Sequence, residues 1–473
     1  MITNIDEILK AVPLDRIVGE HVQLQRRGAN LQGCCPFHDE KTPSFSVSPA
    51  KGIYKCFGCG KGGNNAAQFL MDLHGYTFPE ALEALAAKGH VRIEYADGIN
   101  REEAIKQSKE RQTQREKQIE VMKQGVEILA ANSVIPEGDT VELAGKVYTR
   151  ASINKWKIML AGNKSPVSNS TIDKETALAI GLIGKNEQGR LYDFFYDRVL
   201  FPIHSLSGHI EAITGRILTD KKPKYLNSPD SVLYSKSESL FGIFYNNKHI
   251  NDKGFAYLLE GPTDVILLDQ YGISNAVAPC GTALTATQAK MLSRFTDYVT
   301  IIRDGDKAGL KATVRDIEIL TTAQLSTLVV FLPANEDPAS FISKNGADAW
   351  KEYVDDPANS KDGIKWLISN EVGDGKNEHK KTIAIDIAAR LLAAMDSETL
   401  RQQYITALVK IIGCKEKNLT EALNQELDKR LTKQPKLTTQ QAADKDKFGI
   451  YIQKQNYLNH SGTELSNFIL KPV

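Results

Sequence analysis

The chain has 473 residues, of which 41% are hydrophobic and 25% charged, and 59 Lys and Arg residues oppose 58 Asp and Glu residues. This length predicts about two to four domains, and the near-zero net charge means that a nucleic-acid or membrane partner would have to bind at a local patch. No apolar run approaches the roughly 18 residues of a membrane helix, and the N-terminus lacks the basic start and apolar stretch of a signal peptide. We therefore expect a cytoplasmic protein with no membrane partner.

A cluster of cysteines marks the N-terminal part of the chain. Four of the six cysteines lie within 26 residues, at Cys34, Cys35, Cys56 and Cys59. Without an export signal, such a cluster favours a metal site over a disulfide framework. Cys35 and His38 have the two-residue spacing of a zinc knuckle. Cys56 and Cys59 form a second knuckle, and two knuckles can close the tetrahedral shell of a structural Zn²⁺ ion. The predicted zinc ligands are Cys35, His38, Cys56 and Cys59; the alternative is buried or free cysteines beside an incidental histidine.

Composition and hydrophobic periodicity divide the chain into successive parts. The segment 101–124 holds 7 Lys or Arg, 5 Glu and 5 Gln, with no aromatic residue, glycine or proline. Good helix formers with little apolar surface predict a solvated helical tether. Between residues 254 and 354, short apolar strands alternate with helices, which predicts right-handed crossovers and a mainly parallel sheet. The predicted parts are a zinc-binding domain (1–97), a charged helical linker (98–125), a mixed α+β subdomain (126–250), an α/β domain (251–355), a helical subdomain (356–433) and a polar tail that could begin a further domain (434–473).

Acidic residues follow three of the apolar strands in the α/β domain. Glu260 ends the first of these strands, Asp304 and Asp306 end a second, and Asp337 follows a third. The carboxyl ends of parallel strands meet at one edge of a sheet, so these side chains are expected to converge. Carboxylates gathered in this way repel one another unless cations lie between them, which indicates two or more Mg²⁺ (or Mn²⁺) ions. The predicted ligands of these ions are Glu260, Asp304, Asp306 and Asp337. Taken alone, each motif has the alternative of an ordinary acidic turn.

In chain order, EGPTD and DGD, each closing an apolar strand, resemble a Toprim domain, the catalytic fold shared by bacterial primases, topoisomerases and some nucleases. The resemblance implies that Glu260, Asp304 and Asp306 are catalytic. Glu260 would act as a metal ligand or accept the proton of the attacking 3′-hydroxyl group. Asp264 and Gly305 are expected to support the site.

The segment CCPFHDEKTPSFSVSPAKGIYKCFGCGKGG (34–63) resembles the N-terminal zinc ribbon of bacterial and phage DNA primases. It carries that family's C-P-F-H-x-E-K-T-P-S-F run and its C-F-G-C-G. In that family the ribbon contacts the single-stranded template and helps to choose the start site. Bases stack on aromatic rings and lysines meet phosphates, and the candidates for these contacts are Lys41, Phe45, Lys55, Phe57 and Lys61. The alternative is a ribbon core for the rings and a solvated surface for the lysines.

The segment 198–243 is similar to the N-terminal subdomain of the primase polymerase core. The family's R-V-x-F-P-I, G-R-x-L and P-K-Y-L-N-S-P runs are all present. In the family this basic surface faces the acidic site and guides template and nucleotide phosphates. The matched positions are Arg198, Arg216, Lys224 and Asn227, and Arg150 matches an upstream basic position less closely. The alternative for each side chain is a solvated surface charge.

The resemblance covers roughly residues 3–430. It implies a multidomain α/β protein with an N-terminal zinc ribbon, a mixed α+β basic subdomain, a Toprim domain with a mainly parallel sheet and a C-terminal helical bundle. The implied activity is that of a DNA-dependent RNA primase, with single-stranded DNA, ribonucleoside triphosphates and a replicative helicase as partners. Two alternatives remain open: a Toprim nuclease or topoisomerase-like enzyme, and a non-catalytic replication-initiation factor that binds DNA.

Two features depart from the family pattern. Primases often have Asp-Pro-Asp after the fourth Toprim strand, whereas this chain has Asp337-Pro338-Ala339. One carboxylate is thus missing, and a metal position is weaker or differently supplied, for example by Glu336. The helicase-binding domain usual in the family is not evident, because only the polar tail follows the predicted helices. Either the helicase is recruited differently or the chain is a fragment of a longer protein.

Overall fold

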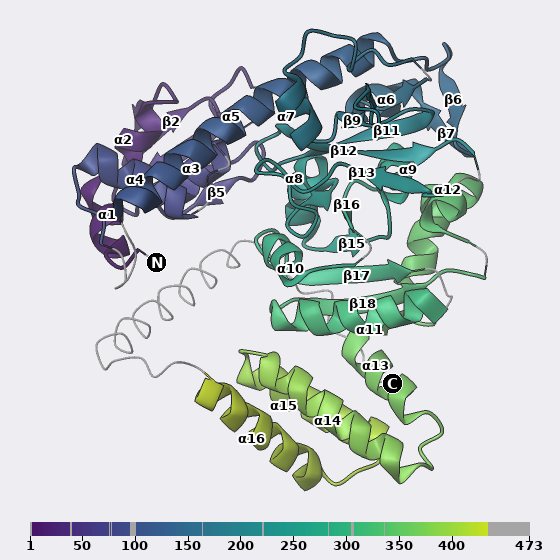
Figure 1. Cartoon of the computed structure of the whole chain (residues 1–473). Helices are drawn as coiled ribbons and strands as arrows, with labels where there is room; N and C mark the ends of the chain where they lie inside the picture. The colour runs from purple at the N-terminus through teal and green to yellow at the C-terminus, as the bar shows by residue number, and fades with distance from the viewer. Residues whose placement is uncertain are drawn as a thin grey trace. The chain divides into compact units, whose positions relative to one another are not determined.

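The computed structural model divides into two compact units, Met1–Leu367 and Ile368–Val473 (Figure 1). The described residues are 2–37, 40–74, 76, 78–94, 101–162, 164–219, 222–281, 283–303, 307–334 and 336–433. Four predicted site residues, His38, Asp304, Gly305 and Asp306, lie outside these ranges, as does the predicted tail 434–473. Among the described helices, none is long and apolar enough to cross a membrane.

The N-terminal domain combines a small antiparallel sheet with four helices. The strands are neighbours in chain order: β1 (Gln25–Arg27), β2 (Asn30–Gly33), β3 (Phe45–Ser48), β4 (Ile53–Cys56) and β5 (Gly62–Gly63). The helices are α1 (Ile5–Ala11), α2 (Leu14–Gly19), α3 (Ala66–His74) and α4 (Phe78–Gly89). The rings of Phe45 and Tyr54 stack with centroids 5.6 Å apart, and Phe69 of α3 meets Tyr54 edge-on at 5.4 Å. Alternate residues of β3 and β4 thus build an aromatic core on one face of the sheet.

An antiparallel sheet of order β13-β12-β11-β8 forms the centre of the next subdomain. Its strands are β8 (Met159–Ala161), β11 (Arg198–His204), β12 (Ile210–Ile217) and β13 (Tyr225–Asn227). Every residue of β11 is buried, because β11 lies between β8 and β12 within this sheet. Two smaller ribbons and two helices complete the subdomain: β6 (Thr140–Leu143) with β7 (Lys146–Thr149), β9 (Ile183–Lys185) with β10 (Leu191–Asp193), α6 (Arg150–Trp156) and α7 (Lys174–Ala179).

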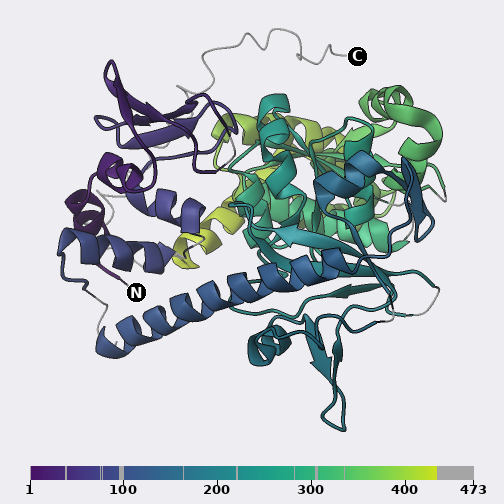
Figure 2. The same cartoon turned by 90° about the horizontal axis from the view of Figure 1, so that it is seen from above.

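A single long helix, α5 (Arg101–Ala131), connects the first domain to this subdomain (Figure 2). The solvated tether predicted for 101–124 is corrected over its second half, where one side of the helix is buried. The buried apolar residues are Val121, Met122, Val126 and Leu129, which join a hydrophobic cluster that includes residues of β11 and β12. Arg115 of α5 also forms an ion pair with Glu211 of β12 at 3.6 Å, and burial raises the pKa of Glu211 to about 7. The apolar positions are too few to mark this packing in the sequence, because the rest of the segment is charged.

The α/β domain contains a six-stranded sheet of order β14-β16-β15-β17-β18-β19. Its strands are β14 (Leu240–Phe241), β15 (Ala256–Leu258), β16 (Ala276–Pro279), β17 (Tyr298–Arg303), β18 (Ser326–Phe331) and β19 (Ser360–Asp362). The four central strands are parallel and the two edge strands antiparallel, which confirms the mainly parallel sheet. The helices between and around them are α8 (Ile243–Lys253), α9 (Pro262–Gln270), α10 (Ala286–Leu292), α11 (Lys307–Thr322) and α12 (Pro338–Asp355).

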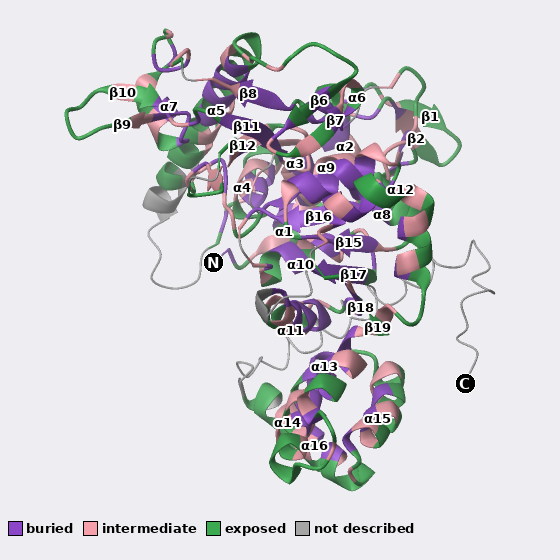
Figure 3. Ribbon diagram, turned by 90° about the vertical axis from the view of Figure 1, so that its right-hand side faces the viewer, coloured by how far each residue is buried: buried purple, intermediate pink, exposed green. Residues whose placement is uncertain are grey.

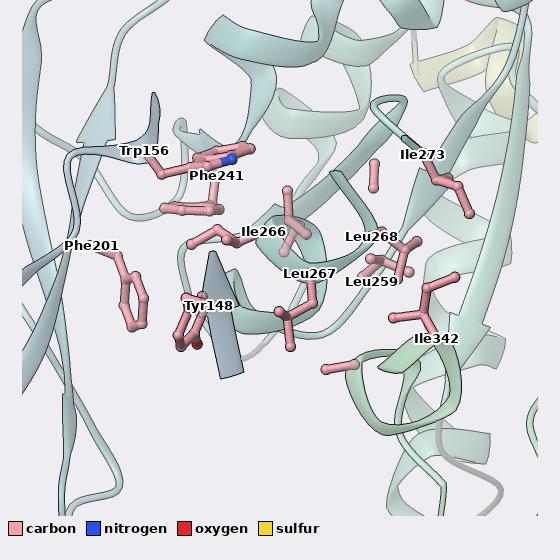
Figure 4. Packing of buried hydrophobic residues seen from close by; sticks show 14 of the residues in the cluster. Tyr148, Trp156, Phe201, Phe241, Leu259, Ile266, Leu267, Leu268, Ile273 and Ile342 are labelled. Carbon is pink, nitrogen blue, oxygen red and sulfur yellow. The ribbon is translucent and has the colours of Figure 1, made fainter. Parts of the chain in front are cut away.

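One hydrophobic cluster joins the mixed subdomain to the α/β domain. Trp156 of α6 stacks on Phe241 of β14 with centroids 5.4 Å apart, and Leu267 of α9 and Ile342 of α12 belong to the same cluster (Figure 4). The central strands β15, β16 and β17 are almost wholly buried (Figure 3). This shared core fixes the antiparallel sheet beside the carboxyl ends of the parallel strands, where the predicted acids lie.

The second unit is helical. Its helices are α14 (Glu378–Ala394), α15 (Glu398–Ile412) and α16 (Glu416–Lys433), while α13 (Gly363–Val372) spans the division between the units. Within the helical subdomain predicted for 356–433, two short breaks separate these three helices. Ser397 caps the start of α15 by accepting a hydrogen bond from Leu400 N–H, and Gly413 ends it in the left-handed conformation with φ of 70°. Both are residue types that favour these helix ends.

Candidate functional site

Three cysteines lie together in the N-terminal domain. The Sγ atoms of Cys35, Cys56 and Cys59 are all within 4.8 Å of one another, and those of Cys35 and Cys59 are 3.8 Å apart. Zn–S bonds of about 2.3 Å in a tetrahedron place two sulfurs roughly 3.8 Å apart, so the spacing fits a structural zinc ion. Cys34 is exposed and is not part of this group. The fourth predicted ligand, His38, lies outside the described residues.

Hydrogen-bond donors surround the sulfur atoms. Phe37 N–H donates to Cys35 Sγ at 3.4 Å and Cys59 N–H donates to Cys56 Sγ at 3.3 Å. Hydrogen bonds with the Cys35 and Cys59 thiols, and then with the Ser44 hydroxyl, hold the pKa of Cys56 far below its usual range. Such donors stabilise the thiolate, which is the form that binds zinc.

Glu40 orders the turn that carries the first knuckle, a role that the sequence analysis did not identify. Its Oε1 accepts hydrogen bonds from Cys35 N–H at 2.7 Å and Ser44 N–H at 3.0 Å, and its Oε2 accepts one from the Ser44 hydroxyl. The residue is the Glu of the C-P-F-H-x-E-K-T-P-S-F run. Its place in the sequence, just after the first knuckle and before Ser44, was the signal that could have identified this role.

Two of the five predicted template-binding residues of this domain are buried, and their assignment is corrected. Phe45 has no exposed surface and belongs to the aromatic core, as its alternative interpretation held. Lys61 is 6% exposed; its Nζ donates to the backbone oxygen of Leu206 at 2.7 Å and lies 4.7 Å from the centroid of Phe37. Lys61 therefore contacts the mixed subdomain and is not presented to a template. The other three candidates, Lys41, Lys55 and Phe57, are exposed.

Glu260 follows β15 and faces a basic side chain at the end of the neighbouring strand. Its Oε1 lies 3.6 Å from Nη1 of Arg303, the last residue of β17. The same guanidinium donates through Nη2 to the carboxylate of Asp316 on α11, and Arg303 and Asp316 are only 3% and 1% exposed. Burial raises the pKa of Asp316, and Arg303 opposes that shift. No local sequence pattern marks this buried pair beside Glu260.

Asp337 follows β18 and caps the start of α12. Its Oδ1 accepts from Ser340 N–H at 2.6 Å, and its own N–H donates to the Ser340 hydroxyl at 2.8 Å. Lys146, at the start of β7, donates to both carboxylate oxygens, at 2.9 and 3.0 Å. Burial acts to raise the pKa of Asp337, but the hydrogen bonds from Lys146 and Ser340 outweigh it and hold the pKa below its usual range.

Asp264 lies behind this edge, in the first turn of α9, and is 7% exposed. Its Oδ1 accepts a hydrogen bond from Ala339 N–H at 3.4 Å. This contact links α9 to α12, and it fits the supporting role predicted for Asp264. Asp304, Gly305 and Asp306 follow β17 in the chain and lie outside the described residues.

Two of the predicted basic-subdomain residues reach the α/β domain. Arg216 Nη1 on β12 lies 3.5 Å from the hydroxyl of Thr263, three residues after Glu260 at the start of α9. Asn227 Nδ2 on β13 donates to the backbone oxygen of Cys280 at 2.9 Å, directly after β16. Lys224 is exposed. The antiparallel sheet thus presents Arg216 and Asn227 at the carboxyl ends of β15 and β16.

The other two basic candidates contact their own surroundings. Arg198 is 6% exposed, and its Nη1 donates to the backbone oxygens of Gly215 and Pro223 at 3.1 and 3.2 Å. Arg150 donates to the backbone oxygens of Gly138 and Pro136. Arg198 is thus bonded to β12 and the segment after it, and Arg150 to the segment before β6, so their geometry favours positioning over direct contact with phosphate.

Three segments of the chain match models of known protein families. Residues 2–101 match a model of the CHC2 zinc finger, residues 143–247 the N-terminal domain of the DNA primase catalytic core, and residues 257–342 a Toprim-like model. A DNA primase of Halalkalibacterium halodurans is 34% identical over 413 residues, which cover 86% of this chain and 68% of the relative. The chain belongs to the DNA primase family.

Solved primase structures share the fold. The zinc-binding and RNA polymerase domains of the Aquifex aeolicus primase are 27% identical, with a TM-score of 0.53, over 89% of this chain and 99% of theirs. A primase catalytic domain solved with single-stranded DNA is 25% identical, with a TM-score of 0.56, over 63% of this chain and 99% of its own. The predicted zinc ribbon, primase core and Toprim domain are thereby confirmed as a fold, while the predicted domain boundaries and individual site residues stay predictions.

Proposed function

We propose that this primase joins ribonucleoside triphosphates into short RNA primers on single-stranded DNA and releases pyrophosphate at each step. The observation that carries the proposal is the position of Arg216, which lies within 3.5 Å of Thr263 at the helix start next to Glu260. The antiparallel sheet brings a basic side chain next to the acids that follow the parallel strands. This arrangement suits a reaction in which nucleotide phosphates bind beside carboxylates that hold metal ions. The primase relatives, including a catalytic domain solved with single-stranded DNA, support this template and this chemistry.

The acidic edge would hold the divalent ions. Glu260, Asp304 and Asp306 supply hard carboxylate oxygens, which suit Mg²⁺ or Mn²⁺. Such ions lower the pKa of a hydroxyl nucleophile and stabilise the charge of the departing pyrophosphate. Glu260 is 40% exposed and lies beside the buried Arg303, so its carboxylate is held at the edge of the sheet while it remains open to a ligand.

The remaining parts would bind and position the substrates. Arg216 and the exposed Lys224 would meet phosphates of template or nucleotide, and Asn227 would hold β13 against the strand edge through its bond to Cys280. On the ribbon, the exposed Phe57 would stack on a template base, with Lys41 and Lys55 near the backbone phosphates. We also propose His38 as the fourth zinc ligand and a replicative helicase as partner. The proposed compartment is the reducing cytoplasm, since none of the six cysteines is in a disulfide bond.

A priming assay with single-stranded template and labelled ribonucleoside triphosphates tests the proposal. The double variant Asp304→Ala/Asp306→Ala removes two of the three proposed metal ligands and is expected to lower primer synthesis by at least about 100-fold, since metal ions contribute several kcal/mol of transition-state stabilisation. The matched control is Asp348→Ala, an exposed acid on α12 of the same domain; it should prime at the wild-type rate.

The same assay separates the alternatives. Cut template without new RNA would favour a Toprim nuclease or topoisomerase-like enzyme. Primer synthesis that survives in the double variant would remove these acids from the catalytic site. A wild-type protein that makes no primer, together with a double variant that still supports replication, would favour a non-catalytic initiation factor.

A further inference from the structure

Asp337, which follows β18, is paired with a lysine from a distant hairpin. Both Oδ atoms of Asp337 accept hydrogen bonds from Lys146 Nζ, at 2.9 and 3.0 Å, across 191 residues of sequence. The Lys146 side chain is only 14% exposed, so the ammonium group is held in place and is not a freely moving surface charge. Distances of this kind are those of a charge-assisted hydrogen bond between an ammonium and a carboxylate.

The backbone around Lys146 explains how it reaches Asp337. Lys146 opens β7, which pairs antiparallel with β6 so that Lys146 is opposite Leu143. The tight turn between the two strands needs left-handed backbone, and it has φ of 51° at Ala144 and 74° at Gly145. The hairpin is anchored on α9 as well, because Thr149 N–H donates to Gln270 Oε1 at 2.8 Å. The hairpin therefore projects a lysine from a fixed position.

The Asp337 side chain is 42% exposed, but both of its carboxylate oxygens already accept hydrogen bonds. Its Oδ1 already accepts from Ser340 N–H in addition to Lys146. The position where many primases carry a second Asp is Ala339, which has no exposed surface and belongs to the hydrophobic cluster of the domain. The neighbouring carboxylate, Glu336, is itself paired with Lys344 at 3.1 Å. A divalent ion at Asp337 would thus meet a carboxylate whose oxygens are hydrogen-bonded and would have to displace an ammonium of like charge.

We propose that the Lys146 ammonium is the resident cation of Asp337, and that no divalent ion binds at Asp337. The inference rests on the proposed function, since it states which acid of the proposed primase site does not bind a divalent ion. It also accounts for Ala339. When a lysine neutralises Asp337, no divalent ion has to be bound there, and the second Asp of the Asp-Pro-Asp run is not needed. Lys146 then acts as a positioning residue: its positive charge neutralises Asp337 and holds the carboxylate in place after β18.

Counting bound Mn²⁺ on the zinc-loaded full chain tests the inference without an activity readout. The number of ions is obtained from the electron paramagnetic resonance signal of free Mn²⁺. We expect Asp337→Asn to bind as many ions as the wild type. We expect Lys146→Met to bind one more, because the bared Asp337 can then take an ion, and Lys146→Met/Asp337→Asn to return to the wild-type number. Loss of one ion from Asp337→Asn, or no additional ion in Lys146→Met, would overturn the inference.

A nearby lysine provides the matched control. Lys344 of α12 pairs with Glu336 at 3.1 Å and its side chain is 71% exposed. Lys344→Met should leave the count unchanged, and a gain of one ion there would also overturn the inference. Zinc content and circular dichroism establish that each variant is folded, and the double variant restores charge balance should Lys146→Met be unstable. If Asp304→Ala/Asp306→Ala keeps every Mn²⁺ ion, the proposed function fails, and that outcome is distinct from a failure at Asp337.

Discussion

The zinc ribbon and the acidic edge of the Toprim sheet both gather negative groups, but they hold these groups together by different means. In the ribbon, three sulfur atoms lie within 4.8 Å of one another among backbone N–H donors. At the Toprim edge, each described carboxylate meets a basic side chain: Glu260 lies beside Arg303, and Asp337 is bonded to Lys146. We therefore expect the ribbon to depend on a metal for its fold. The carboxylates of Glu260 and Asp337 are instead paired with the chain's own cations, so we expect this edge to keep its fold when divalent ions are removed.

The largest expected effect is the loss of zinc from the ribbon, and it should differ between two adjacent cysteines. Cys35 is buried in the sulfur cluster, whereas Cys34 is exposed. Cys35→Ser should lose the zinc ion and with it the fold of the ribbon, because structural zinc sites contribute about 10–16 kcal/mol that is coupled to folding. Cys34→Ser should keep both. Zinc content by mass spectrometry and limited proteolysis of the ribbon measure the two effects.

The Toprim domain provides the internal control for this prediction. Its cooperative unfolding should be the same in Cys34→Ser, Cys35→Ser and the wild type, because neither cysteine belongs to its hydrophobic cluster. Retention of a full zinc equivalent by Cys35→Ser would contradict the assignment of Cys35. If Cys34→Ser lost the zinc instead, the first knuckle would begin one residue earlier than the spacing predicts.

A middle-sized effect is expected where the Toprim edge depends on an arginine. Arg303 lies between Asp316 and Glu260, and both Arg303 and Asp316 are nearly inaccessible to solvent. Arg303→Met leaves the Asp316 carboxylate buried without its cation, and removal of one partner from such a pair costs about 3–5 kcal/mol. Urea unfolding of the variant measures the loss. The matched control is Lys311→Met, at an exposed lysine of α11, the helix that carries Asp316; it should change stability by less than about 0.5 kcal/mol.

The pH dependence of this loss has a definite sign. Burial raises the pKa of Asp316 above its usual 3.8, and Arg303 opposes the shift. In Arg303→Met the larger part of this opposition is gone and only the weaker attraction of Arg315 remains, so the folded state binds a proton more tightly than the unfolded state. Stability then falls as pH rises from about 4 through the raised pKa, more steeply than in the wild type. Arg303→Met/Asp316→Asn should recover part of the loss at neutral pH. An equal loss at acidic and neutral pH would mean that packing, not charge, accounts for it.

The comparison also explains what could be predicted from the sequence. The ribbon ligands and the strand-end acids are marked by local patterns, since two-residue knuckle spacing and an acid after an apolar run are visible within ten residues. Lys146 and Arg303 carry no such mark. Lys146 meets Asp337 only because a hairpin and a helix start come together across 191 residues, and Arg303 looks like any charged residue that closes a strand.

Register decided the errors within the ribbon. Phe45 and Phe57 stand in similar polar surroundings in the sequence, but Phe45 belongs to β3 and points into the core, whereas Phe57 follows β4 and is 70% exposed. Strand residues alternate between faces, so a shift of one residue exchanges core and surface. Lys61 was misplaced for a different reason: its partner, the backbone oxygen of Leu206, lies 145 residues away. Neither the register nor such a partner can be read from a single sequence.

The smallest expected effect concerns the exposed ring of the ribbon. Phe57 lies between two ligand positions of the second knuckle, and its N–H donates to Ser44 O at 2.9 Å, which fixes the backbone beneath the ring. Base stacking on an aromatic ring is worth about 1–3 kcal/mol, so Phe57→Ala should weaken binding of single-stranded DNA by roughly 5- to 150-fold. Phe57→Trp should bind at least as well as the wild type. Fluorescence anisotropy with a labelled oligonucleotide measures all three.

The design of this measurement separates stacking from charge and from folding. The dependence of affinity on salt should stay the same in Phe57→Ala, because no phosphate contact is lost, and zinc content should not change because the ring is outside the core. Phe78→Ala removes another exposed ring of the same domain, 38% accessible at the start of α4, and should bind as the wild type does. An equal weakening by both variants would assign the effect to the ribbon as a whole. Wild-type affinity in Phe57→Ala would show that the ring does not stack on a template base. Contacts of the ribbon with the template would then come from its exposed lysines alone.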